Sequence, residues 1–294
     1  IALPAAWAQR IVGGRLHYIR HGGPKRMGYA WLAEAPDVDV MFTAWDARDG
    51  AASRHLYVSE LLRDSGFVPR VYESAKFSKQ TLVVSESLGG YTLRDLIDDH
   101  LEANDAQASL VLPFEWSLPL MADLLTSFAE LEKLEAVCGD LIASSLHLVD
   151  GGRHLMLADL SAISLPGAPG RSAVSVRLPP EFEEGSPFAA PSAVWQAGLV
   201  SSSMFLPPRW VDFDVDTAEG RDRARTYNRD KFSLEEEAGF EDLPADIASI
   251  LSGMLNKDPA ARWTAEVALE KVLEAAAARG IDIDLKAHEA PPLW

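Results

Sequence analysis

The side-chain pattern changes at Gly89 and Gly90, and this change limits the fold of the chain more than any other feature. Before these glycines, apolar and β-branched runs separated by turn residues predict short strands. The expected strands are Arg15–Ile19, Tyr29–Ala33, Val38–Phe42, Val68–Glu73 and Thr81–Ser87. One helix, Ala51–Ser65, lies among them and stops at Gly66. Its expected apolar stripe consists of Val58, Leu61 and Leu62.

After the two glycines the pattern becomes mostly helical. Thr92–Glu102 and Ser117–Leu134 both show helical spacing of apolar residues. Pro119 then falls in the first turn of the second helix, where a missing N–H costs little. The side chains expected to face inward are Leu93, Leu96 and Ile97 in the first helix, and Met121, Leu125, Phe128 and Leu131 in the second.

A β-hairpin is expected next, formed by Ser145–Val149 and His154–Ala158. The connection, Asp150-Gly151-Gly152, is a strong turn signal between two apolar runs. A loop rich in Pro, Gly and Ser follows, and Val194–Ala278 is again mostly helical. A small β-rich part followed by a larger helical part is an α+β layout.

The chain has 294 residues and a formal net charge of −17. This charge argues against a nucleic acid or an anionic membrane surface as the main partner, because both would repel it. No apolar run approaches the roughly 20 residues that a membrane helix needs. The charge is compatible with a protein partner whose surface is neutral or basic, and equally with a role in solubility alone.

The start of the chain bears on the compartment, whereas the cysteine content says little about it. Cys138 is the single cysteine, which excludes an intrachain disulfide and a cysteine-rich zinc site. The chain begins at Ile1 without an initiator Met, which predicts a processed segment. The apolar start Ile1–Ala8 is too short and uncharged for a signal peptide, and we interpret it as a leader remnant. We therefore favour secretion, or a secretory organelle, over the cytoplasm.

Six short segments follow one another in an order and spacing that resemble the eukaryotic-type protein kinases, over nearly the whole chain from about Arg15 to Ala275. They are Thr81–Leu93 as last small-lobe strand and hinge, Cys138–Ser145 (CGDLIASS) as catalytic loop, Leu157–Ser161 (LADLS) at the metal-binding motif, Leu178–Phe182 (LPPEF) as the end of the activation segment, Ala193–Gly198 as the start of the central helix, and Ile250–Arg262 (ILSGMLNKDPAAR) as the late helix pair. The resemblance implies a two-lobed fold, with a β-rich N-lobe over residues 10–88 and a helical C-lobe over residues 89–285.

The resemblance also implies which positions should carry the chemistry, and most of them hold other residue types. The phosphate-binding lysine of the third strand falls on Thr43, or on Met41 if the register slips by two, and neither is charged. Glu60 is the candidate for its helix glutamate partner, although a solvated Glu is the simpler interpretation. The glycine-rich loop is interrupted by Pro24, Lys25 and Arg26.

In the catalytic loop, Asp140 matches the base of the kinase pattern. Ile142 and Ser145 replace its Lys and Asn, so the cation and the second magnesium ligand are lost. Asp159 matches the metal-binding Asp. Together with Glu86 in the hinge, it is where the resemblance places any weak contact with Mg–ATP.

The scaffold positions of the resemblance are better preserved. Glu181 and Arg262 match a buried ion pair that ties the activation segment to the large lobe. The aspartate that begins the central helix and braces the catalytic loop is replaced by Ala193, which predicts that this loop is held differently.

Loss at the chemistry and retention at the scaffold are typical of a pseudokinase. The expected function is a catalytically inactive scaffold or allosteric regulator with little or no ATP binding and no required cofactor. It is similar to the secreted pseudokinases of apicomplexan parasites, including the rhoptry and cyst-wall kinds, which implies a signalling or virulence role and a partner such as an active kinase or another secreted protein. Two alternatives stay open: an unorthodox active kinase that uses Asp140 and Asp159, and a nucleotide sensor without phosphotransfer.

Overall fold

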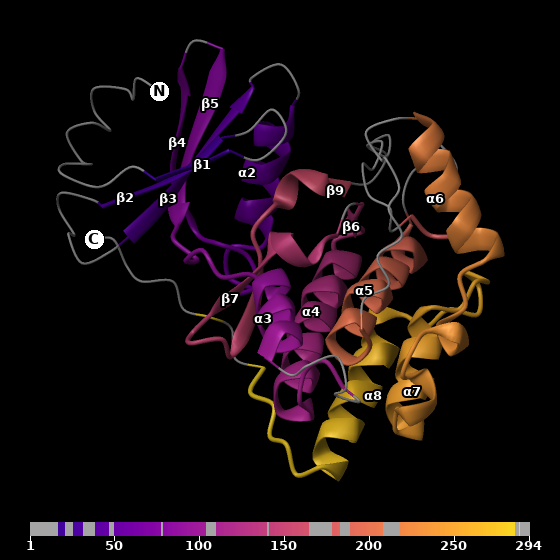
Figure 1. Ribbon diagram of the computed structural model, residues 1–294. Coiled ribbons are helices and arrows are strands. Elements are labelled where there is room, and N and C mark those ends of the chain that lie inside the picture. Colours follow the sequence, from indigo (N-terminus) through magenta and orange to yellow (C-terminus); the bar gives the residue numbers. More distant parts are fainter. Residues whose placement is uncertain are drawn as a thin grey trace. The chain divides into compact units, whose positions relative to one another are not determined.

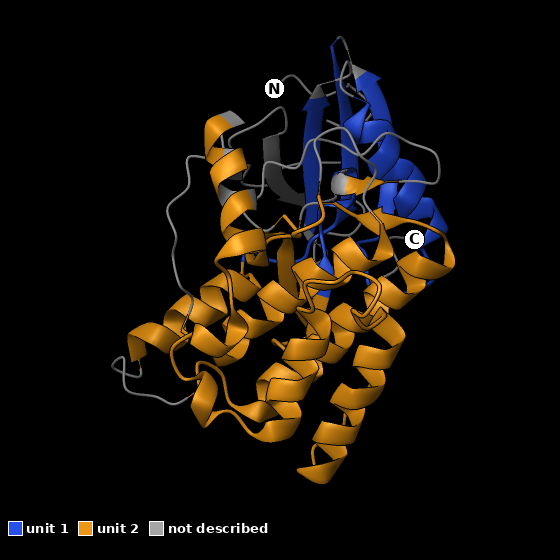
Figure 2. Ribbon diagram, turned by 90° about the vertical axis from the view of Figure 1, so that its right-hand side faces the viewer, with its two compact units in different colours: residues 1–90, 156–161, 286–294 blue, residues 91–155, 162–285 orange. Residues whose placement is uncertain are grey.

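The computed structural model is of mixed α and β type, with a sheet region and a helical region (Figure 1). It describes residues 17–20, 26–31, 39–46, 50–77, 79–103, 110–139, 141–164, 178–182, 189–207, 218–285 and 288. The chain divides into two compact units (Figure 2). Unit 1 comprises residues 1–90, 156–161 and 286–294, and unit 2 comprises residues 91–155 and 162–285. The α+β layout predicted from the sequence is therefore present.

Unit 1 contains a five-stranded sheet in which every neighbouring pair is antiparallel. The strands, in the spatial order of the sheet, are β1 (His17–Arg20), β2 (Arg26–Trp31), β3 (Asp39–Asp46), β5 (Gln80–Glu86) and β4 (Val71–Phe77). All five strands expected from the sequence exist, but their bounds differ. β3 continues to Asp46 and does not end at Phe42, since Val40 to Asp46 all pair with β5. β4 begins at Val71 and not at Val68, because its pairing with β5 starts there.

Helix α2 (Ala51–Leu61) packs against this sheet. Ala51 and Ala52 join Trp45 and Val83 in one buried cluster. Val58 and Leu62 are buried as predicted, but Leu61 is 44% exposed, so this part of the predicted stripe is wrong. Because neighbouring helical residues point about 100° apart, the burial of Leu62 turns Leu61 toward solvent.

A segment distant in sequence belongs to unit 1. The N–H of Leu157 donates to the carbonyl of Phe67 at 3.0 Å. The Nε of Arg54 on α2 donates to the carbonyl of Ser161 at 3.1 Å. These contacts place residues 156–161 with the sheet, whereas the division at 88 and 89 expected from the sequence assigns them to the larger part.

The described part of unit 2 is mainly helical. Its helices are α3 (Leu93–Ala103), α4 (Phe114–Lys133), α5 (Ala190–Phe205), α6 (Ala218–Asp230), α7 (Ala245–Met254) and α8 (Ala265–Ala278). Helix α4 packs against both α5 and α8. All the residues of α3 and α4 predicted to face inward are buried. No described helix combines the length and apolarity that crossing a membrane requires.

Helix α4 begins earlier than the pattern predicts. Its N-cap is Pro113, and the N–H of Ser117 already donates to the Pro113 carbonyl at 2.9 Å. Pro119 therefore lies in the second turn, and the prediction that it occupies the first turn is wrong. The helix forgoes the backbone bond that the missing N–H of Pro119 would make to the carbonyl of Glu115.

The predicted hairpin is confirmed as strands β7 (Leu146–Val149) and β8 (His154–Leu157). In the turn, Asp150, Gly151 and Gly152 all have positive φ angles of 52°, 71° and 87°, which explains the two glycines. The N–H of Leu148 donates to the carbonyl of Tyr91 at 3.0 Å, which ties the hairpin to the start of α3. A second small sheet pairs β6 (Val137–Cys138) with β9 (Ile163–Ser164).

The described residues also include four short 3₁₀ turns. They are η1 (Ala143–Ser145), η2 (Leu160–Ala162), η3 (Leu234–Glu236) and η4 (Phe240–Asp242).

Candidate functional site

The sequence-predicted site residues fall in both units, and each unit is described by itself. In unit 1, Thr43 lies on β3, where it is aligned with Met27 of β2 and Val83 of β5. Its side chain is buried, and Phe42 and Ala44 beside it are fully buried. Met41, the alternative position, is buried as well. The centre of this strand therefore offers a hydroxyl or a thioether to a ligand, and no positive charge.

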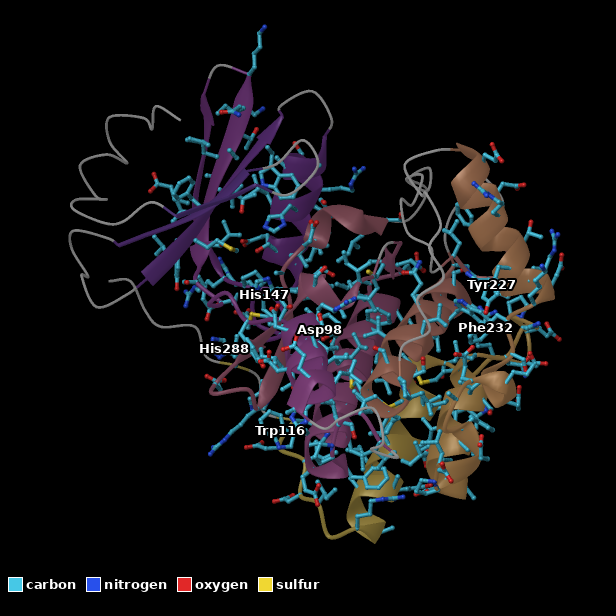
Figure 3. All side chains as sticks on the ribbon, in the orientation of Figure 1. Asp98, Trp116, His147, Tyr227, Phe232 and His288 are labelled. Atoms are coloured by element: carbon cyan, nitrogen blue, oxygen red, sulfur yellow. The ribbon has the colours of Figure 1, made fainter. Side chains whose placement is uncertain are left out.

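Glu86 ends β5 and is buried, with both carboxylate oxygens in contact with protein groups. Its Oε2 accepts a hydrogen bond from the N–H of Arg70 at 3.2 Å. Its Oε1 pairs with the imidazole Nε2 of His288, which Figure 3 labels. Nothing in the sequence pattern links His288 to Glu86, since the two positions lie 202 residues apart. A ligand that contacts Glu86 would have to compete with these two partners.

Asp159 is half-buried and belongs to unit 1. Its Oδ1 accepts hydrogen bonds from both the N–H and the hydroxyl of Ser161, at 3.1 Å and 2.7 Å. Ser161 thus occupies one carboxylate oxygen of Asp159. Arg54 anchors the same serine through its carbonyl, so the turn is fixed from α2.

Two further positions of unit 1 were singled out by the sequence. Glu60 is exposed and forms an ion pair at 3.3 Å with Arg63, which lies two residues beyond the end of α2. A solvated ion pair of this kind is the simpler of the two interpretations of Glu60. Pro24 and Lys25 lie outside the described residues, and Arg26 is described only as part of the β2 backbone.

In unit 2, residues 142–145, which follow Asp140 in the chain, close into a tight turn. Asp140 itself lies outside the described residues. The hydroxyl of Ser145 donates to the carbonyl of Ile142 at 2.7 Å. The N–H of Ile142 in turn donates to Oγ of Ser145 at 3.4 Å. The Ile142 side chain is 40% exposed. Ser145 therefore uses its oxygen to close the η1 turn, and the position of the expected lysine presents an apolar side chain to solvent.

The side-chain amide of Gln196 holds the loop around position 140. This role of Gln196 was not identified from the sequence. Gln196 lies on α5, one turn beyond Ala193, and is fully buried. Its Oε1 accepts from the N–H of Leu141 at 3.0 Å, and its Nε2 donates to the carbonyl of Gly139 at 3.1 Å. One amide thus satisfies a donor and an acceptor that flank position 140. A carboxylate could satisfy only the donor, since it has no proton to give.

Glu181 and Arg262, expected to pair, are in direct contact. Two guanidinium nitrogens of Arg262 bind the two carboxylate oxygens of Glu181, at 2.7 Å and 3.0 Å. The same guanidinium donates to the carbonyls of Pro191 and Asn256, at 2.7 Å and 2.8 Å. It also lies 5.1 Å above the ring centroid of Trp195. The Arg262 side chain has no exposed surface, so these four hydrogen bonds are all made inside the protein.

The pKa of Glu181 reflects this arrangement. Burial alone would raise it, but the hydrogen bonds and charge of Arg262, with a hydrogen bond from the Ser192 hydroxyl at 3.0 Å, bring it below the ordinary value. The carboxylate is therefore charged at neutral pH, and the pair is a true ion pair.

A second buried acid, Asp123 of α4, was not identified from the sequence. Its Oδ2 accepts from the N–H of Leu155 at 2.9 Å and lies 3.2 Å from Nδ1 of His154. Burial raises the pKa of Asp123 to about 6, against the lowering effects of these two partners. A single acidic residue among the mostly apolar buried residues of α4 is the only signal that could have identified it.

Within the described parts of both units, no three His, Cys, Asp or Glu side chains are grouped so as to hold a metal ion. Comparison with known proteins gives no assignment: no protein-family model matches the chain, and no curated protein matches it.

Proposed function

We propose that this chain is a degenerate protein kinase, a pseudokinase that acts by binding a protein and not by transferring phosphate. The proposal combines the motif order of the sequence with the α+β division into a sheet region and a helical region. The chain's net charge of −17 favours a partner with a neutral or basic surface, such as an active kinase or another secreted protein.

The observation that carries the proposal is the loop at Ile142 and Ser145. Phosphoryl transfer depends on cations and metal ligands that neutralise the phosphates. Here the hydroxyl of Ser145 is bonded to the carbonyl of Ile142, and Ile142 itself has no charge. The buried ion pair of Glu181 and Arg262 is intact in the same unit. Such a combination preserves the scaffold while the groups needed for transfer are missing.

Weak nucleotide binding is the corresponding expectation in unit 1. The carboxylate of Glu86 accepts a hydrogen bond from the N–H of Arg70 and pairs with His288. One carboxylate oxygen of Asp159 accepts a hydrogen bond from the hydroxyl of Ser161. The buried Thr43 brings no charge to β3. A single remaining carboxylate without a lysine partner should hold Mg–ATP poorly.

The test is a thermal-unfolding titration of the full chain with ATP and ADP, with and without Mg²⁺ or Mn²⁺. A ligand that binds the folded state raises the melting temperature once its concentration passes Kd. We expect no shift at millimolar nucleotide. A metal-dependent shift that disappears in Asp159→Ala would instead support a nucleotide sensor. Phosphate transfer that disappears in Asp140→Ala would establish an active kinase and refute the proposal.

A further inference from the structure

Two large aromatic side chains of unit 2 are exposed close to the same helix. Trp116, labelled in Figure 3, lies in the first turn of α4 and is 42% exposed. Tyr91 lies two residues before α3 and is 41% exposed. Single exposed apolar residues are ordinary, but Trp and Tyr are the residue types most enriched where proteins bind one another.

Both aromatic side chains are held in place by α3. The phenol of Tyr91 donates to Oδ2 of Asp99 at 2.5 Å. The neighbouring residue, His100, makes an edge contact with Trp116, with ring centroids 5.9 Å apart. The hairpin turn also passes beside the indole, since a Cβ built on Gly152 would lie 3.8 Å from Trp116 Cζ3. Tyr91 and Trp116 thus each contact one of two consecutive residues of α3, Asp99 and His100.

This restraint matters for binding. A side chain already ordered in the free protein loses little conformational entropy when a partner covers it. The hydrogen bond to Asp99 also raises the pKa of Tyr91 to about 12, so that the phenol stays a neutral donor. We call Tyr91, Asp99, His100 and Trp116 the Trp116 surface.

The charge around the Trp116 surface is mainly negative. Besides Asp99 within the surface, exposed carboxylates lie on α3 and at the start of α4: Asp95, Glu102 and Glu115. On α3, Arg94 is paired with Asp98 at 2.5 Å, which leaves that cation largely compensated. Arg153 is an exposed cation on the hairpin turn. The carboxylates outnumber it, in keeping with the acidic chain as a whole.

We propose that the Trp116 surface is a docking site for an arginine-containing segment of a partner protein. A guanidinium stacks on the face of an aromatic ring and pairs with a carboxylate at the same time, which a neutral side chain cannot do. The inference deepens the proposed function and rests on it, because it assumes that the chain acts by binding a protein.

The experiment follows the indole N–H signals of the ¹⁵N-labelled full chain by NMR. The chain has 8 tryptophans, and the Trp116 signal is identified by its loss in Trp116→Phe. The titrant is a synthetic peptide in which arginines alternate with serines. The matched peptide carries glutamine in place of each arginine. We expect the arginine peptide to shift the Trp116 signal and the glutamine peptide to leave it in place.

Variants test the same contact without the label. Trp116→Ala and, independently, Asp99→Asn should each weaken binding of the arginine peptide by about tenfold. Tyr57→Ala is the control, since Tyr57 is 55% exposed and lies on α2 of unit 1. It should leave the affinity unchanged. Thermal unfolding of each variant verifies that it is folded. We expect all of them to fold, because the substituted side chains are exposed.

Three outcomes would overturn the docking site: no shift at millimolar arginine peptide, equal shifts with both peptides, or an affinity that falls as much in Tyr57→Ala as in Trp116→Ala. Broadening of the Trp116 signal with protein concentration alone would assign the surface to a second copy of the chain and would overturn it too. The nucleotide titration separates this failure from that of the proposed function. Phosphate transfer together with arginine-specific binding would refute the pseudokinase and leave the docking site standing.

Discussion

Arg262 binds both carboxylate oxygens of Glu181 while its side chain has no exposed surface. This pair joins residues 81 positions apart in the chain. The bond is bidentate, the geometry in which Arg and a carboxylate interact most strongly. It links residue 181 to the α7–α8 connection and to the start of α5 at Pro191.

Arg262→Met should therefore destabilise the protein by about 3 kcal/mol, because it leaves a partly buried carboxylate without its cation. Urea unfolding measures the change. The matched control is Arg229→Met, since Arg229 pairs with Asp230 at the surface, where both side chains are half-exposed. The control should have no resolvable effect. Equal effects of the two variants would show that the Glu181–Arg262 pair does not stabilise the fold.

The substitution Gln196→Glu should make stability depend on pH. In its protonated form the new carboxyl can donate to Gly139 and accept from Leu141, as the amide does. The charged form would face the Gly139 carbonyl inside the protein, so burial raises its pKa above the unfolded value. The variant should match the wild type at about pH 4 and lose on the order of 2 kcal/mol by about pH 7.5.

Denaturant unfolding at a series of pH values checks this prediction. Gln196→Leu is the companion variant, because it removes both hydrogen bonds at every pH and should be destabilised throughout. A Gln196→Glu variant that is equally unstable at low and neutral pH would contradict the role assigned to the amide.

Asp123 should make the stability of the wild-type protein fall as the pH rises, whereas an acid paired with a cation at the surface has the opposite effect. The pKa of Asp123 rises on folding from 3.8 to about 6, so the folded state holds the proton more tightly. Relative to Asp123→Asn, the wild type should be most stable below about pH 4 and lose up to ~3 kcal/mol as the pH rises through 6. His154 and Asp284 face the same carboxylate and act on it in opposite directions.

Asp246→Asn provides the comparison for this measurement. The pKa of Asp246 is lowered by its hydrogen bond to Arg279, so its stabilisation should be present at neutral pH and lost as the pH falls. The two variants should therefore differ from the wild type with opposite slopes against pH. Parallel slopes would contradict the assignment for Asp123.

Gly253 of α7 lies against the indole of Trp263. A Cβ built on Gly253 would overlap the atoms of that ring. Gly253→Ala should destabilise the protein by about 1–3 kcal/mol through overpacking. The control is Gly90→Ala, where a Cβ would meet nothing within 4 Å. In a Trp263→Ala background the substitution of Gly253 should become nearly neutral, and an unchanged cost there would exclude the ring as the cause.

Much of the local structure could be predicted from the sequence. Periodicity alone located the helices at α3 and α4 together with their buried faces, because both depend on the spacing of neighbouring residues. The hairpin at Gly151 was predictable for a similar reason, since its turn needs residues that tolerate positive φ. The Glu181–Arg262 contact came from the order of the motifs, not from local pattern.

The remaining features depend on contacts between residues far apart in the chain. Leu61 fits the apolar spacing of its helix, yet the packing of α2 leaves it in solvent. The role of Gln196 became clear only from its hydrogen bond to Gly139, which lies far from it in the sequence. The role of His288 likewise became clear only from its contact with Glu86. The sequence by itself determined the α+β order and the acidic charge. The tertiary structure decided which polar groups are buried together, because hydrogen bonds between distant residues form only when packing removes them from water.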